Sequence, residues 1–427
     1  MKTKLCMWLP RITYFTFALW ILAQIVVIIL FWGAPQGSDQ GEYMKLAQRC
    51  FDRGEWYPMA EDVYAASSIW APGLINYFIL QFKLFGTLNL NMVLNLLMNV
   101  GIAAEIFFLG KKFFTERTAM IAVILWCLLY SNLMIVAPSG TEIPFLFIAL
   151  SGFCLTLRPK IDLMVLAGVL FAVANWIRPL VIIFLLMSLV YMLVKKYSWK
   201  QFASLLVSLG IVIIIIGKAT EAKIGYFVYQ SVTSGVNLIM TANDRAYGGV
   251  ATSLLSDSTS TAYIKDCEKL TFAERDSIWK ARGVDWIREH PVRYAYLFVK
   301  KLGGLYVEDS WADRPILGGY GFVDSYAVAG NVSHRAFINK AVQMGLKSLV
   351  YYGILILCCY SIVVHRHEWL TYKSILLLLL LAGTFSTCLF SVSPHYHYPF
   401  MFVIVLFAAY GVEYILNKKT NYEKNND

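Results

Sequence analysis

The sequence contains few charged residues. Only 15% of its 427 residues are Asp, Glu, Lys or Arg, whereas soluble domains carry about 25%. It also lacks an Asp-x-Asp triplet, a glycine-rich phosphate loop and any alternation of strand and helix patterns. These absences exclude an ordinary soluble domain and argue against a nucleotide-sugar site of the soluble type. No internal repeat or low-complexity tract is present.

Long apolar runs take the place of the missing charge. The chain is 58% hydrophobic, and its runs approach the ~20 residues that a helix needs to cross ~30 Å of hydrocarbon. We therefore expect an all-α polytopic membrane protein with about ten transmembrane helices. The first run is longer than the core of a signal peptide, which favours an uncleaved anchor. The expected spans are 12–32, 89–109, 117–137, 142–157, 162–177, 179–194, 201–217, 348–364, 374–392 and 399–416.

Basic residues set the expected orientation. Lys and Arg gather in every second connection, while the turns 138–142 and 393–398 contain none. Because positive loops stay cytoplasmic, we predict a single membrane domain over 1–427 in the inner (plasma) membrane, with both termini cytoplasmic. A first outer loop over 33–88 and a large outer loop over 218–347 follow. The net charge of +10 mostly reflects this bias, so membrane lipids are expected partners and nucleic acid is not.

The outer loops carry their own helical patterns. Segment 40–54 is amphipathic, as expected of a helix on the membrane surface, and 273–290 is a second helix, after which Pro291 can open a third. Two of the eight cysteines, Cys50 and Cys267, lie in these loops. A disulfide and two free thiols are both compatible with the sequence.

Asp39 is the first candidate site residue. It lies seven residues beyond Trp32, which ties a carboxylate to the outer surface of the bilayer, where a lipid-linked head group would sit. Asp39 followed by Glu42 is also the pattern of a helix N-cap with its reciprocal partner. The two roles can coexist.

Several motifs in this order resemble the GT-C glycosyltransferase superfamily, the lipid-phosphosugar-dependent enzymes that include bacterial aminoarabinose transferases and protein O-mannosyltransferases. The first-loop signature is similar to Ser38-Asp39-Gln40-Gly41-Glu42-Tyr43. The other matching pieces are Trp70-Ala71-Pro72-Gly73-Leu74, Thr141-Glu142-Ile143-Pro144, Asn175-Trp176-Ile177-Arg178-Pro179, Trp286-Ile287-Arg288-Glu289-His290-Pro291 and His395-Tyr396-His397-Tyr398-Pro399. The resemblance covers nearly the whole chain.

The resemblance implies an inverting glycosyltransferase of hexosyl or pentosyl type. It would move a sugar from a polyprenyl-phosphate donor to a glycan, lipid or protein acceptor of the cell envelope on the outer face. Asp39 matches the family's first-loop aspartate and is the candidate base that takes the acceptor's proton. Glu42 is either its neighbour in a cap or a group that orients the acceptor.

Four further residues are candidates for substrate binding. Arg178 suits a lipid phosphate, or it is an interfacial arginine that contacts ordinary head groups. Glu142 is placed to assist binding of sugar or acceptor, or it favours the start of the next helix through the helix dipole. His395 and His397 can bind phosphate or hold a divalent metal, or they only pack at the interface. A histidine stands where the family has an arginine, so a permanent cation is in doubt there.

Two other classes of function remain open. A polysaccharide ligase or polymerase would use arginines and a histidine of the late loop and would not require Asp39. A lipid-linked sugar transporter or flippase would place charges at the bilayer midplane. Glu105 and Glu413 lie within spans, and we expect them to pair with lysines near the cytoplasmic ends.

Overall fold

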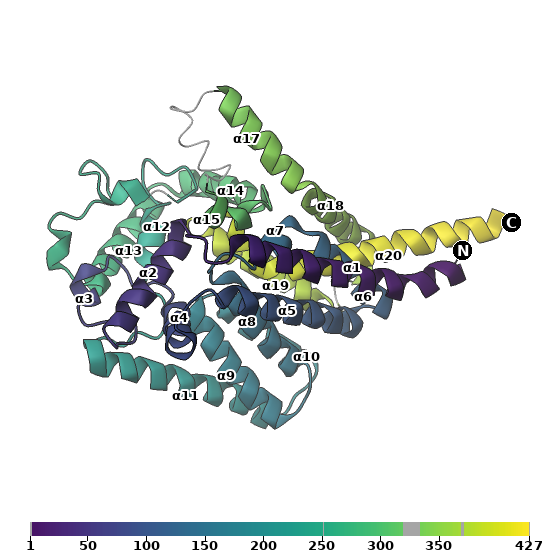
Figure 1. Ribbon diagram of the computed structural model, residues 1–427, viewed down its shortest axis with the longest axis horizontal. Helices are drawn as coiled ribbons and strands as arrows, with labels where there is room; N and C mark the ends of the chain where they lie inside the picture. The colour runs from purple at the N-terminus through teal and green to yellow at the C-terminus, as the bar shows by residue number, and fades with distance from the viewer. Residues whose placement is uncertain (1, 251, 319–333, 369–370, 427) are drawn as a thin grey trace.

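The computed structural model describes residues 2–250, 252–318, 334–368 and 371–426, and these residues form helices without named strands. The helices of the two predicted outer loops gather at one end of the molecule, whereas α1 begins and α20 ends at the other (Figure 1). This arrangement agrees with the expected grouping of the two termini. The predicted all-α class is confirmed.

Each predicted span coincides with apolar helix. The helices are α1 (Lys2–Phe31), α5 (Asn91–Phe113), α6 (Glu116–Leu128), α7 (Tyr130–Met134), α8 (Glu142–Thr156), α9 (Ile161–Ile177), α10 (Val181–Val194), α11 (Trp199–Ile224), α18 (Leu349–Val364), α19 (Ser374–Cys388) and α20 (Met401–Asn426). The expected span 117–137 is divided between α6 and α7, which meet at the extended residue Leu129.

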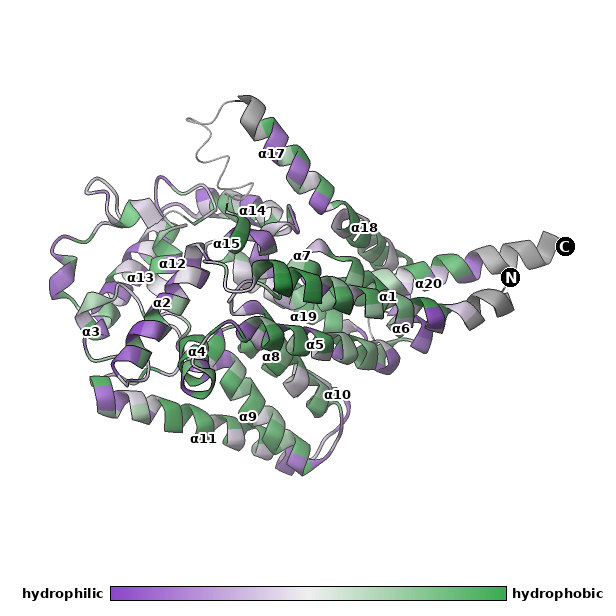
Figure 2. Ribbon diagram, viewed as in Figure 1, coloured by the Kyte–Doolittle hydropathy of each residue, from purple (hydrophilic) through white to green (hydrophobic). Residues whose placement is uncertain are grey.

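The number of crossings stays a prediction. Among the described residues, four helices are long and apolar enough to cross a bilayer alone, and a fifth results if α17 (His334–Lys347) and α18 form one span bent by 59°. Helices α8, α9, α10 and α19 are apolar but only 14 to 17 residues long. Figure 2 shows that hydrophobic residues dominate the bundle and hydrophilic ones its ends and the outer segments.

The outer segments contain more helix than the sequence suggested. They comprise α2 (Ser38–Asp52), α3 (Asp62–Ala65), α4 (Pro72–Phe85), α12 (Ser234–Ile239), α13 (Phe272–Glu289), α14 (Pro291–Tyr306) and α15 (Arg314–Leu317). The described residues also form five short 3₁₀ segments, η1 (Thr252–Leu255), η2 (Cys267–Lys269), η3 (Trp311–Asp313), η4 (Arg366–Glu368) and η5 (Pro394–Phe400). The predicted helices α2 and α13 are confirmed, and Pro291 does open α14. Helix α4 was not anticipated.

The apolar stripe of α2 packs inside the protein. Ala47 and Cys50 are fully buried, α2 lies against α4, and the Phe51 ring stacks on Phe82 with centroids 5.4 Å apart. The stripe is therefore occupied by α4 and the core, which corrects the expectation that it rests on the membrane surface. Cys50 is buried and Cys267 exposed, and both thiols are free.

The two predicted outer loops are fastened to each other. Arg275 of α13 is buried, and its guanidinium donates to the backbone oxygens of Tyr64 and Ala66 in the first loop. An isolated β-bridge joins Ile69 to Val232. The loops thus cover one end of the bundle together.

Among the described side chains, the two carboxylates within spans do not pair with lysine as expected. Glu105 accepts a hydrogen bond from Ser151 of α8, and Glu413 accepts from Thr115 and Thr118 at the start of α6. Hydroxyl groups of neighbouring helices reach these carboxylates because interhelical contacts are shorter than the path to a snorkelling lysine.

Candidate active site

The centre of the candidate site is a buried ion pair. Arg178 Nη1 lies 3.1 Å from Glu142 Oε1, and only 14% and 6% of the two side chains are exposed. Glu142 is the first residue of α8, so contact with Arg178 and a favourable place in the helix dipole coexist. Arg178 follows the last residue of α9 in extended conformation, as expected of a residue before proline.

A glycine allows the loop before α4 to approach this arginine. A Cβ atom on Gly73 would lie 2.6 Å from the backbone of Trp176 and Ile177, so only glycine fits there. The Trp70–Leu74 motif and the Asn175–Pro179 motif of the sequence therefore meet in space. Close backbone contact explains why a proline–glycine pair opens α4 at this point.

The last hairpin completes the surroundings of the ion pair. The guanidinium carbon of Arg178 lies 4.9 Å from the ring centre of Tyr396, a cation–π contact. His395 Nε2 lies 3.9 Å from Glu142 Oε1, and its Nδ1 is 2.9 Å from Ser393 Oγ. His395 therefore lies next to Glu142, on which Arg178 also acts.

Asp39 lies beside this group on α2. Tyr43, one helical turn later, is within electrostatic range of Asp39, Glu142, Tyr396 and Arg178. Burial raises the pKa of Tyr43 well above its usual value, and the charges of Asp39 and Glu142 raise it further. Asp39, Glu142 and Arg178, three of the residues that sequence sidedness placed at one interface, therefore lie near Tyr43.

The carboxyl of Asp39 is partly desolvated. The residue reaches the surface, yet burial of the carboxyl among protein atoms raises its pKa above the usual value, and the charge of Glu42 adds to the rise. Asp39 is not the helix cap, because α2 begins at Ser38 with Gly37 at the N-cap position and no side-chain cap. The alternative interpretation of the Asp39–Glu42 pattern is therefore wrong.

Two predicted residues face away from the ion pair. Glu42 is exposed and pairs with Lys45 at 2.7 Å. His397 is fully buried; its Nδ1 lies 2.8 Å from the Leu305 backbone oxygen, and its Nε2 lies 3.9 Å from Asp309 Oδ1. Neither side chain is placed to touch a substrate at Arg178.

Arg314 is a residue that sequence reasoning missed. It begins α15, pairs with the buried Glu308, and lies, like Arg178, within electrostatic range of His395. The next residue, Pro315, accepts a hydrogen bond of 2.7 Å from the Gly37 backbone N–H at the start of α2. The available signal was the Arg-Pro pair Arg314-Pro315 in the predicted large outer loop, which matches Arg178-Pro179; the chain's other Arg-Pro pair, Arg158-Pro159, lies in a basic connection on the expected cytoplasmic side.

The described residues do not form an evident metal site. Among them, no group of three or more His, Cys, Asp or Glu side chains is arranged to hold a metal ion. The two imidazoles considered for a divalent metal diverge, since His395 faces Glu142 and His397 faces Asp309.

Comparison with known proteins places this geometry in context. No protein-family model and no curated protein sequence matches the chain. Among solved structures, it is similar to the oligosaccharyltransferase of Archaeoglobus fulgidus tethered with an acceptor peptide, at 13% identity and a TM-score of 0.48 over 96% of this chain and 50% of the other. The same archaeal enzyme, AglB, in complex with an inhibitory peptide and dolichol-phosphate gives 14% identity and a TM-score of 0.48, over 98% and 52%. ArnT from Cupriavidus metallidurans bound to undecaprenyl phosphate gives 13% and 0.40, over 92% and 77%.

These structural neighbours are GT-C glycosyltransferases. The chain spans about half the length of the oligosaccharyltransferase chains. Identities of 13–14% with TM-scores below 0.5 do not transfer an activity or a residue role to this chain.

Proposed function

We propose that this protein is an inverting glycosyltransferase that moves a sugar from a polyprenyl-phosphate donor to an acceptor on the outer face of the cytoplasmic membrane. The observation that carries the proposal is the gathering of Asp39, Glu142, Arg178 and His395 from four separate stretches of chain at the loop-covered end of an apolar bundle. Transfer from a lipid phosphate requires a carboxylate to take the acceptor's proton and a nearby cation to bind the phosphate, both at this end of the bundle.

Asp39 is the proposed base. The acceptor hydroxyl attacks the anomeric carbon, its proton passes to Asp39, and the bond between that carbon and the phosphate oxygen breaks with its electron pair leaving on the phosphate. Attack opposite the leaving group inverts the configuration. A carboxyl with a raised pKa holds the transferred proton better than an ordinary aspartate, because catalytic bases work best near the operating pH.

Arg178 is the proposed ligand of the departing phosphate. Guanidinium has five N–H donors, so its bond to Glu142 leaves donors for an oxyanion. Glu142 and the Tyr396 ring fix the orientation of this group before the substrate arrives, and such preorganisation is a large part of catalysis by charge stabilisation. Arg314, near the same histidine, adds positive potential on the phosphate side.

Sugar transfer by isolated membranes tests the proposal. Membranes that contain the wild type, Asp39→Asn or Asp52→Asn at equal protein levels are supplied with polyprenyl-phosphate hexoses and pentoses labelled in the sugar. Asp52 is the matched control, since it lies on the same helix, is exposed and accepts a hydrogen bond from Gln48. We expect transfer by the wild type and by Asp52→Asn, and a loss of about 100-fold or more in Asp39→Asn, the scale of a missing general base.

The possible results separate the alternatives. Full transfer by Asp39→Asn removes this residue as the base. An absence of transfer from every lipid-linked sugar contradicts the donor class and turns attention to a ligase, a polymerase or a transporter.

A further inference from the structure

The turn between α7 and α8 has irregular backbone inside the protein. Residues 136–139 are buried and lie directly before the helix that begins at Glu142. Buried backbone groups outside a helix need hydrogen-bond partners, because an unpaired one loses its bonds to water without replacement. The partners of this turn are side chains from two other segments.

Three amide side chains supply these partners. Asn95 Nδ2 on α5 donates to the backbone oxygens of Val136 and Pro138, each at 3.2 Å. Gln36 spans the carbonyl between them: its Nε2 donates to Ala137 O at 3.1 Å, and its Oε1 accepts from the Ser139 N–H at 2.7 Å. Asn91, one turn before Asn95, donates to Ser139 Oγ at 3.3 Å.

These bonds join both halves of the candidate site. Gln36 lies three residues before Asp39, and the turn likewise ends three residues before Glu142. Gly140, between the turn and the helix, has so little space that a Cβ atom would lie 2.3 Å from Glu142 Oε2. A rotation of the turn toward α8 would therefore press Gly140 against the Glu142 carboxylate and disturb its place beside Arg178.

We infer that Asn95 and Gln36 are positioning residues that fix the distance between Asp39 and the Glu142–Arg178 pair by clamping the turn 136–139 between α5 and the first outer loop. Neither residue touches the reacting atoms in this role. The kinetic part of the inference rests on the proposed function, whereas the clamp itself does not.

Asn99 provides a matched control. It lies one turn beyond Asn95 on the same buried face, and its Nδ2 also makes two hydrogen bonds, to Gln24 Oε1 at 3.0 Å and to Asn132 O at 3.2 Å. Replacement of either asparagine by leucine removes two bonds and leaves similar volume. Of these two asparagines, only Asn95 donates hydrogen bonds to the turn 136–139 that precedes Glu142.

The experiment compares Asn95→Leu, Gln36→Met and Asn99→Leu by amide hydrogen exchange in detergent and by sugar-transfer kinetics. We expect exchange of residues 136–141 to rise at least ten-fold in the first two variants and to stay at the wild-type rate in the third. A displacement of about 1 Å costs on the order of 100-fold in rate, so kcat should fall by 10- to 100-fold in the first two, while kcat in Asn99→Leu stays within about two-fold.

The two measurements fail separately. Unchanged exchange of 136–141 in both clamp variants overturns the clamp. Increased exchange with an unchanged kcat overturns the positioning role. If even the wild type transfers no sugar, the proposed function fails, and hydrogen exchange still decides whether the clamp exists.

Discussion

Removal of the charges of the Arg178–Glu142 pair, singly and together, is the sharpest test of the site. At 3.1 Å, two unit charges attract by about 5 kcal/mol at an effective dielectric constant of 20. Both side chains are at least 86% buried, so the loss of one partner leaves the other charge desolvated and unpaired. That costs about 3–5 kcal/mol.

The double variant carries neither charge and should be far less destabilised than the two singles combined. A loss of 1 kcal/mol lowers Tm by about 2–4 °C in chains of up to about 250 residues, and by less, about 1–2 °C, in a longer chain such as this one. We therefore expect Arg178→Gln and Glu142→Gln each to lower Tm by roughly 5 °C. Arg178→Gln/Glu142→Gln should recover most of that loss. The assay is thermal unfolding in detergent followed by tryptophan fluorescence.

Sugar transfer by the same three variants separates stability from catalysis. All three should lose transfer, because the double variant regains stability without regaining a cation for the phosphate. Additive Tm losses in the double variant would contradict a direct ion pair. A double variant that regains transfer would show that the pair only stabilises the fold.

Three other predictions concern titration and burial. Because the Glu42 charge raises the pKa of Asp39 and a base must be deprotonated, Glu42→Gln should move the acid limb of the pH–rate profile to lower pH. Burial lowers the pKa of Lys301 to about 8, so its ammonium disfavours folding until it deprotonates; the wild type should gain stability from pH 8 to 10 in urea titrations, and Lys301→Met should not. His397→Gln and Asp309→Asn, which separate a fully buried pair, should each destabilise strongly, and a double-mutant cycle of Tm should show that the two losses are not additive. An unchanged acid limb in Glu42→Gln would contradict the first prediction. The same gain of stability with pH in Lys301→Met as in the wild type would contradict the second, and additive losses of Tm in the His397 and Asp309 variants would contradict the third.

Sidedness alone was enough to predict most of the site. Counting apolar runs and basic turns places Asp39, Glu142, Arg178 and His395 at one interface, and a chain confined to a bilayer has few other ways to arrange them. The Arg178-Pro179 pair also predicts the end of α9, because the residue before proline avoids helical conformation. Both inferences depend only on the physics of spans and local backbone.

The divergence of His395 and His397 could not be predicted in the same way. Residues 394–400 form the 3₁₀ segment η5, in which each residue turns by about 120°. Two residues therefore rotate the side chain by about 240°, which sends His395 toward Glu142 and His397 into the core against Asp309. The sequence carries no signal that distinguishes this short 3₁₀ segment from a loop in which both imidazoles face the substrate.

Helix α4 and Arg314 were missed for a different reason. Helix α4 has 14 residues and is mostly buried under the outer loops, so it is too short to appear as a span and too apolar to appear as a surface helix. Arg314 reaches the site only because α15 is held against the start of α2. Long-range contacts of this kind are decided by tertiary packing, which local patterns do not report.

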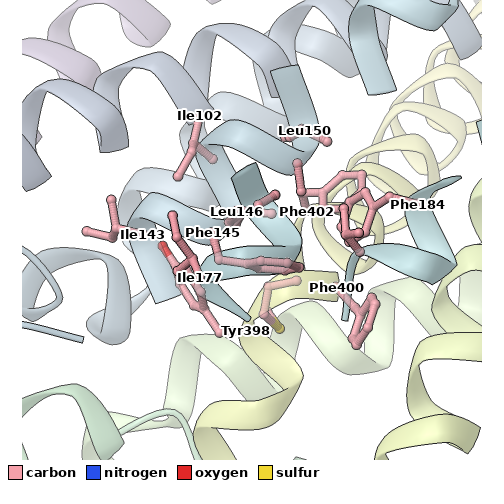
Figure 3. Packing of buried hydrophobic residues seen from close by; sticks show 14 of the residues in the cluster. Ile102, Ile143, Phe145, Leu146, Leu150, Ile177, Phe184, Tyr398, Phe400 and Phe402 are labelled. Atoms are coloured by element: carbon pink, nitrogen blue, oxygen red, sulfur yellow. The ribbon is translucent and has the colours of Figure 1, made fainter. Parts of the chain in front are cut away.

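The rigid core next to the site explains how irregular segments can hold charged groups in place. Figure 3 shows buried side chains from α8, α9 and the start of the last span packed together, among them Phe145, Ile177 and Tyr398. These residues lie three, one and three positions from Glu142, Arg178 and His395, respectively, and each is at least 96% buried. A close-packed interior tolerates little displacement, so each functional side chain is anchored within one turn of a fixed residue. Asp39 itself is exposed near the start of α2, and a Cβ atom on Gly41 of the same turn would lie 2.3 Å from the Gln36 backbone oxygen, so the position of Asp39 should depend on Gln36 and the turn that Gln36 clamps.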